Sequence, residues 1–201
     1  ELEVRSAKKD LHSGLFGGVV HNPAQVLCEL IAGMHDDSGR VTLPGFYDKV
    51  RPLEGDERAA LDRLPITDDD WKEMAGVTRL WGESDYSPVE RIGARPTLEV
   101  NGLLSGFTGA GSKTVLPAKA MAKISMRLVP DMDPDEVAAQ FRAYLKENAP
   151  ATVTWSVKEM AFAKAAVMNR KGPAIQKAMD ALRAVFNVEP VFKREGGTVP
   201  I

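Results

Sequence analysis

A histidine within a glycine-rich stretch is the strongest candidate for chemistry in this sequence. His12 lies in Asp10-Leu11-His12-Ser13-Gly14-Leu15-Phe16-Gly17-Gly18, after a short strand-like run and before a helix. Glycine reaches positive-φ conformations that other residues resist, so the stretch predicts a tight loop that can direct a side chain outward. The alternative is a structural histidine that only hydrogen-bonds a neighbouring carbonyl group. These residues alone do not decide between the two.

Two other patterns resemble binding motifs but fail on spacing. The run Gly106–Gly111 followed by Lys113 resembles a phosphate-binding loop, but Ser112 intervenes and a strand, not a helix, is predicted next. The triplet His35-Asp36-Asp37 offers metal-ligand types, yet no second histidine or acidic pair lies at ligand spacing. We interpret His35 as a histidine that complements a helix C-terminus, and we expect no metal site within this chain.

The composition is that of an ordinary globular protein. Of 201 residues, 44% are hydrophobic and 27% charged, and the formal net charge is −2, which disfavours nucleic-acid binding. No apolar run approaches the roughly 20 residues that a membrane helix needs. The single cysteine, Cys28, falls among apolar residues at helical spacing, so we expect a small buried core group and a reducing, cytoplasmic setting.

Periodic patterns predict a small sheet with two helices. Alternation or helical spacing assigns, in order, a strand at 2–8, a helix at 22–35, a strand at 96–104, a long strand ending at 129, a helix from 133 and a strand at 152–157. This order is typical of a four-stranded antiparallel sheet with two helices on one face, the ferredoxin-like arrangement of the α+β class. Arg127 is expected near a strand end, opposite the core face.

The remaining segments break this pattern. Residues 36–95 are interrupted by proline and glycine, which predicts an insertion with short helices at 56–64 and 67–75. Asp68-Asp69-Asp70 suits the start of the second helix, where acids complement the helix dipole, better than a cation site. Beyond the sheet, the sequence predicts a helix from Gly172-Pro173 and a strand at 190–194. We interpret these two elements as the opening of another domain.

Six sequence blocks, in order over nearly the whole chain, resemble one enzyme family. They are Asp10 to Gly18, Val20-His21-Asn22-Pro23, Leu43-Pro44-Gly45-Phe46-Tyr47-Asp48, Gly111-Ser112-Lys113-Thr114-Val115-Leu116-Pro117, Arg127-Leu128-Val129-Pro130 and Arg194-Glu195-Gly196-Gly197-Thr198-Val199-Pro200. Together they resemble the carnosinase and aminoacylase type of dinuclear zinc peptidases, peptidase family M twenty. Each block is weak by itself, but six in register are specific.

The resemblance implies a domain organisation. Residues 1–162 resemble the lid domain that mediates homodimerisation in this family, with the insertion at about 36–95. Residues 163–201 resemble a truncated return segment of the α/β catalytic domain. The two zinc ions of the full-length enzyme would have all their ligands outside this chain, so the fragment alone is expected to bind no metal and to be inactive.

The resemblance also assigns residue roles. His12 matches the histidine that reaches into the partner subunit's active site and stabilises the substrate oxyanion. Thr114 matches a position that assists substrate binding across the same interface, and Arg127 matches the residue that binds the substrate's terminal carboxylate. Gly196, Gly197 and Thr198 match a backbone turn that lines the substrate pocket.

Two functional hypotheses follow. The first is the dimerisation and substrate-capping domain of a zinc-dependent dipeptidase or related amide hydrolase, acting on peptides or acyl-amino acids. The second is a stand-alone α+β dimerisation or binding module without a catalytic role. Flanking sequence would discriminate between them, because only the first requires zinc ligands upstream and downstream of this segment.

Overall fold

The computed structural model describes residues 1–197, which form two compact units. Unit 1 comprises residues 1–48, 97–127 and 133–163, and unit 2 comprises residues 49–96, 128–132 and those from 164 onward. Within the described residues, no helix is long and apolar enough to cross a membrane.

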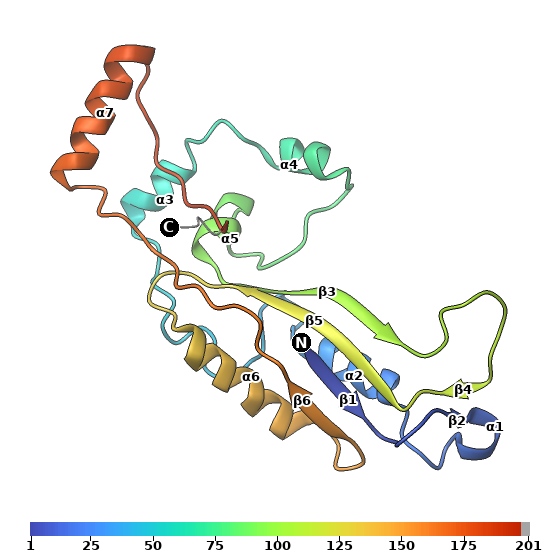
Figure 1. Cartoon of the computed structure of the whole chain (residues 1–201). Helices are drawn as coiled ribbons and strands as arrows, with labels where there is room; N and C mark the ends of the chain where they lie inside the picture. The colour runs from blue at the N-terminus through green and yellow to red at the C-terminus, as the bar shows by residue number, and fades with distance from the viewer. Residues whose placement is uncertain (198–201) are drawn as a thin grey trace. The chain divides into compact units, whose positions relative to one another are not determined.

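Unit 1 contains the predicted four-stranded antiparallel sheet, in the order β3-β5-β1-β6 (Figure 1). Its strands are β1 (Leu2–Arg5), β3 (Thr97–Ser105), β5 (Lys119–Arg127) and β6 (Thr154–Val157). Each strand is antiparallel to its neighbours, and the β3–β5 pair carries a bulge between Val100 and Gly102. The α+β prediction and the ferredoxin-like order of strands are confirmed.

The two faces of this sheet differ in chemistry. In β1 and β5, Leu2 pairs with Ala122 and Val4 with Ala120, and all four side chains are buried. On the opposite face, Glu3 accepts hydrogen bonds from Lys119 and Arg5, and the Lys119 bond is the largest cause of the lowered pKa of Glu3. Apolar side chains therefore fill only the face that the helices cover, as expected for a half-buried antiparallel sheet.

Helices α2 (Pro23–Ala32) and α6 (Pro134–Asn148) cover the apolar face. The side chain of Asn22 caps α2 by accepting from the Ala24 amide, and Pro23 occupies the first turn, as the sequence predicts. The Tyr144 hydroxyl of α6 donates to the Leu30 carbonyl of α2 at 2.8 Å. A Cβ at Gly33 would lie 2.4 Å from that hydroxyl oxygen, so glycine permits this close contact.

Two predictions within unit 1 are wrong in detail. The strand predicted to run unbroken to Val129 is divided at Pro117 into β4 (Val115–Leu116) and β5, because proline lacks the N–H that a continuous ladder needs. Cys28 is exposed, since its position on α2 points away from the buried stripe of Val26, Leu27 and Leu30. Helical spacing shows that Cys28 has apolar neighbours in the sequence, but it does not show how wide the buried face of the helix is.

Unit 2 contains four helices in its described residues: α3 (Gly55–Leu61), α4 (Asp68–Ala75), α5 (Pro88–Ala94) and α7 (Pro173–Phe186). Thr67 and Asp70 form a capping box at α4, which agrees with the dipole interpretation of the acidic run. Our prediction contains no helix at α5, although Ser87 and Glu90 form a capping box there, which is a recognisable signal for a helix start.

The strand predicted at 190–194 is absent: these residues are not in regular secondary structure. Alternation of apolar and polar residues indicates an extended segment, but a strand also needs a neighbour with which to share backbone hydrogen bonds. No strand of the four-stranded sheet or of the β2–β4 pair accepts this segment as a partner.

Candidate active site

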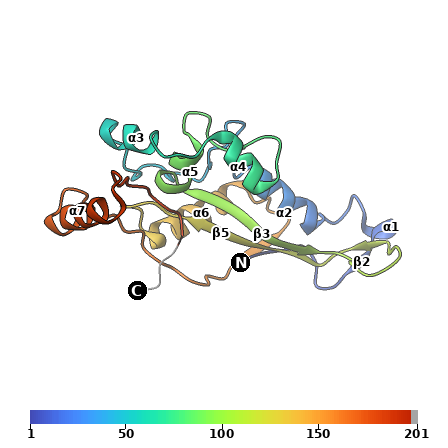
Figure 2. The ribbon, with the colours of Figure 1, turned by 90° about the horizontal axis from the view of Figure 1, so that it is seen from above.

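His12 lies on a projection of unit 1, here called the arm and comprising residues 7–20 and 106–118. Within it, β2 (Leu11–His12) pairs with β4, and the one-turn helix α1 (Ser13–Phe16) follows directly. Figures 1 and 2 both show α1 and β2 beyond the end of the sheet. The Asp10 carboxylate accepts a hydrogen bond from the Ala118 amide at 2.9 Å, which joins the two segments of the arm at its base, directly before β5. Asp10 begins the block from Asp10 to Gly18, but the sequence alone predicts no role for it.

The orientation of the His12 ring is determined by its neighbours. Its Nδ1 accepts a hydrogen bond from the Gly14 amide at 3.0 Å, so the ring proton of the neutral imidazole must be on Nε2. Nε2 lies 3.3 Å from the Thr114 hydroxyl oxygen. A Cβ at Gly14 would lie 2.9 Å from the His12 Cε1, which explains why glycine stands there. The structure therefore brings His12 and Thr114 together.

This arrangement suits hydrogen-bond donation. Nδ1 is occupied by a backbone donor, so the exposed reactive atom of His12 is the protonated Nε2. A donor held in one orientation stabilises negative charge that develops on an oxygen, because it needs no reorganisation during the reaction. The ring is thus better arranged as an oxyanion donor than as a general base.

The arm also exposes apolar side chains around His12. Leu15 and Val19 are 74% and 79% exposed, and Phe16 and Phe107 are also among the exposed large apolar residues. Apolar groups gathered on a projection are typical of a surface that contacts another protein.

Arg127 occupies the opposite end of β5 from the arm, where it pairs with Thr97 and is exposed as predicted. The nine residues of β5 span roughly 27 Å at about 3.4 Å per step. Figure 1 shows β5 running between the two regions. A small substrate cannot contact His12 and Arg127 of the same chain at once.

The predicted pocket turn belongs to unit 2. Gly196 and Gly197 follow Arg194 outside regular secondary structure, and a Cβ at Gly196 would lie 2.9 Å from the Ile92 carbonyl oxygen. Thr198 lies outside the described residues.

No group of three His, Cys, Asp or Glu side chains among residues 1–197 could hold a metal ion. The Asp36 carboxylate accepts from the Ser38 amide and hydroxyl and from the Arg40 amide, and the Ser38 hydroxyl bond is the largest cause of its lowered pKa. Burial lowers the pKa of His35. The side chains of the described residues therefore do not fit a metal centre.

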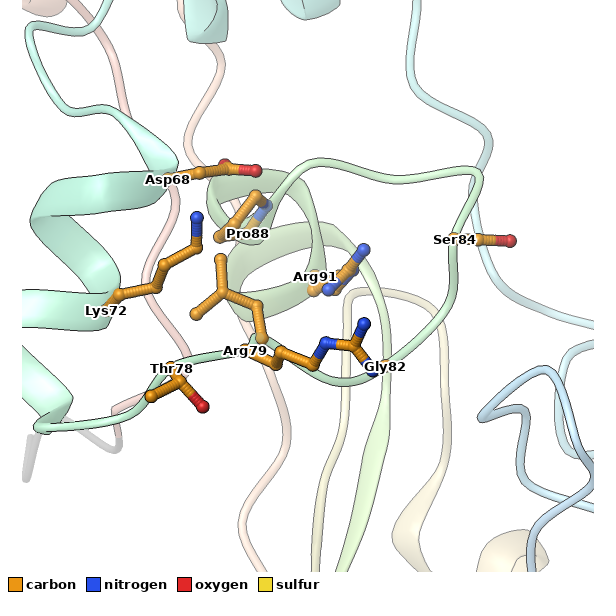
Figure 3. Close-up of a pocket in the computed structure, with 9 residues that line it drawn as sticks. Asp68, Lys72, Thr78, Arg79, Gly82, Ser84, Pro88 and Arg91 are labelled. Atoms are coloured by element: carbon orange, nitrogen blue, oxygen red, sulfur yellow. The ribbon is translucent and has the colours of Figure 1, made fainter.

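A cavity of about 630 Å³ lies in unit 2 (Figure 3). Lys72 and Arg91 line it, but Lys72 is paired with Asp69, and Arg91 donates to the backbone carbonyls of Trp81 and Glu83. Figure 3 shows the Ser84 hydroxyl directed away from the other lining side chains. The polar groups do not converge on a common point, so this cavity lacks the arrangement of a catalytic site.

Comparison with known proteins gives a consistent result. Residues 1–153 match the family described as peptidase dimerisation domain. The chain is 32% identical over 206 residues to a Cys-Gly metallodipeptidase of Candida albicans, covering 100% of this chain and 42% of the relative. It is 29% identical over 205 residues to a Beta-Ala-His dipeptidase of Rattus norvegicus, covering 100% of this chain and 41% of the relative.

A solved structure agrees with this result. The dipeptidase Dug1p from Saccharomyces cerevisiae has a TM-score of 0.81 at 27% identity, over 99% of this chain and 42% of that one. This chain spans about two fifths of the length of the curated relatives that it matches.

Proposed function

This chain belongs to the peptidase dimerisation domain family of the peptidase family M twenty enzymes, and we propose that it is the dimerisation and substrate-capping domain of a dipeptidase or related amide hydrolase. The relatives are named as dipeptidases. Their names favour a domain of a peptide-hydrolysing enzyme over a stand-alone binding module without a catalytic role. Residues 1–162 would form the lid and residues 163–201 the return segment of the catalytic domain.

The observation that carries this proposal is the separation of His12 from Arg127 along β5. Both side chains match substrate-contacting positions of the family, yet one strand of roughly 27 Å lies between them. Both can serve one substrate only if they come from different chains. The proposal is therefore a composite site, with His12 from one subunit and Arg127 from the other.

Each residue of this chain has a defined task in that site. The Nε2–H of His12 donates to the carbonyl oxygen of the scissile amide as negative charge develops on it. Before the substrate binds, the Thr114 hydroxyl oxygen accepts a hydrogen bond from this Nε2–H, and Thr114 also assists substrate binding across the interface. Arg127 offers planar donors to the substrate's terminal carboxylate, and the Gly196–Gly197 turn lines the pocket with Thr198.

The site requires a two-fold symmetric homodimer in which both subunits use the same surface. We assign this surface to the exposed side of the helix predicted at Asn22–Met34, which is α2, and to the edge strand β3. β3 is nine residues long and exposes Leu103 and Leu104, whereas the other edge strand, β6, has only four residues. Unpaired edge groups of a long strand favour pairing with a second copy.

The cofactor and location are further parts of the proposal. Two zinc ions would activate water in the full-length enzyme, held by ligands outside this chain. The free thiol of Cys28 is consistent with a reducing, cytoplasmic setting.

A subunit-mixing experiment tests the composite site. Full-length His12→Ala and Arg127→Ala subunits carry different affinity tags, and the heterodimer is purified through both. In the composite model, one of its two sites keeps both wild-type residues, Arg127 from the His12→Ala subunit and His12 from the Arg127→Ala subunit, and the other site lacks both. We therefore expect about half the activity of the wild-type dimer, since the two sites are related by symmetry.

The parent homodimers provide the control. Each should be strongly impaired, and the Arg127→Ala defect should be smaller for substrates with an amidated C-terminus, because these lack the carboxylate. A heterodimer no more active than its parents would refute the composite site, since a site formed within one chain is never intact in this mixture.

A further inference from the structure

Arg194, which precedes the Gly196–Gly197 turn, is held by a buried ion pair within unit 2. Its Nε donates to Oε1 of Glu57 on α3 at 2.6 Å, and its second nitrogen donates to Oε2 at 2.8 Å. The two side chains are only 13% and 11% exposed. A guanidinium bound to both oxygens of one carboxylate is fixed in direction as well as in position.

The backbone near Arg194 is also closely packed. A Cβ at Gly93 of α5 would lie 2.3 Å from the Cβ of Arg194 and 2.8 Å from its carbonyl carbon. At the next contact along the chain, a Cβ at Gly196 would lie 2.9 Å from the Ile92 carbonyl oxygen. The segment from Arg194 to Gly196 therefore lies against α5 without room for another side chain at either contact.

We propose that Glu57 is a positioning residue for substrate binding: by holding Arg194, it fixes the Gly196–Gly197 turn against α5. This inference rests on the proposed function, because only the family resemblance makes this turn part of the substrate pocket. Glu57 touches neither the substrate nor the reacting atoms and acts through Arg194. Helix α3 of the insertion thus supports a substrate-binding element through Arg194, which follows Glu57 by 137 positions.

The pair has a predictable effect on kinetics. A backbone turn that contacts the substrate in both the ground state and the transition state contributes uniform binding, which is seen in KM and not in kcat. A loosened turn should therefore weaken substrate binding and leave the chemical step close to normal. A pair that only stabilises the fold would change neither parameter of the folded enzyme.

The test uses the full-length enzyme with Glu57→Gln, which removes the charge and keeps the size. We expect KM for a free dipeptide to rise about tenfold while kcat stays within about threefold. Hydrogen exchange should be faster in a peptide covering 191–197. Arg194→Lys, a milder change that keeps the charge but loses the paired donors, should act in the same direction and serves if Glu57→Gln fails to fold.

The matched control is Glu189→Gln. Arg183 donates to both oxygens of Glu189 at 2.7 and 2.8 Å, the same geometry as the Glu57 pair, but this pair is exposed. Its loss should leave KM and the exchange of 191–197 unchanged.

Two outcomes would overturn the positioning role. These are unchanged exchange of 191–197 in Glu57→Gln and Arg194→Lys, and faster exchange without a rise in KM. A wild-type enzyme without peptidase activity would overturn the proposed function itself, and it would be recognised before any variant is compared.

Discussion

The chemistry of His12 depends on which ring nitrogen carries the proton. The Gly14 amide occupies Nδ1, so Nε2 is left as the donor, beside the Thr114 hydroxyl. This choice follows from one backbone hydrogen bond, which forms because the histidine precedes a glycine by two positions. A residue that acts as an oxyanion donor should affect the rate of the reaction more than substrate affinity.

We therefore predict that His12→Ala in the full-length enzyme lowers kcat by roughly 100- to 1000-fold, the usual loss for one oxyanion donor. Metal content should be unchanged, because His12 is not a proposed ligand. The control is His21→Ala, since His21 bonds Thr152 and lies outside the proposed site. Steady-state kinetics and metal analysis measure both effects, and less than a threefold change in kcat would return His12 to a structural role.

Among the structural elements, the arm can hold His12 in a fixed position only if the base of the arm is rigid. Asp10 joins the two segments of the arm at this base through the Ala118 amide, while the amides of Ser6 and Ala7 donate to the Ala118 carbonyl. The peptide groups on both sides of Ala118 are thereby engaged. A small shift at the base would be enlarged at His12, and oxyanion stabilisation depends on short, well-directed hydrogen bonds.

Asp10→Ala should accordingly lower kcat by up to about 100-fold, the scale of a misplacement of about 1 Å, and should speed hydrogen exchange at the Ala118 amide. Asp10→Asn keeps an acceptor oxygen and should remain close to wild type in both measurements. Equal losses in the two variants would show that the charge of Asp10 matters and not its hydrogen bond to Ala118.

For the whole molecule, assembly and activity should be linked. Leu103 and Leu104 on the edge strand β3 are 55% and 56% exposed, and an apolar edge of this kind favours association. Since the proposed site takes His12 from the second chain, a dissociated enzyme would lose its oxyanion donor even when each subunit is correctly folded.

Leu104→Lys in the full-length enzyme should weaken dimerisation at least about tenfold, because like charges would meet across a two-fold interface. Specific activity should then fall on dilution together with the dimer fraction measured by light scattering. Ser156→Lys, which places the same charge on the exposed face of the other edge strand β6, is the control and should change neither. A wild-type enzyme that is monomeric and fully active would contradict the shared site.

The sequence by itself determined the four-stranded sheet of unit 1, the two helices that cover it, and the family. Alternation, helical spacing and caps such as Asn22 before Pro23 operate over a few residues, so they can be recognised without knowing the fold. The same local patterns misplaced Cys28 and predicted a strand at 190–194, because solvent exposure and strand pairing depend on what lies beside a segment in space.

Only the tertiary structure decided how the candidate site residues are distributed. The hydrogen bond between His12 and Thr114 joins residues 102 positions apart, and the ion pair between Glu57 and Arg194 joins residues 137 positions apart. The nine residues of β5 also place the arm and Arg127 at opposite ends of one strand, which is the geometry on which the proposed composite site rests. No local periodicity encodes such contacts, since they arise only when chain closure brings distant elements together.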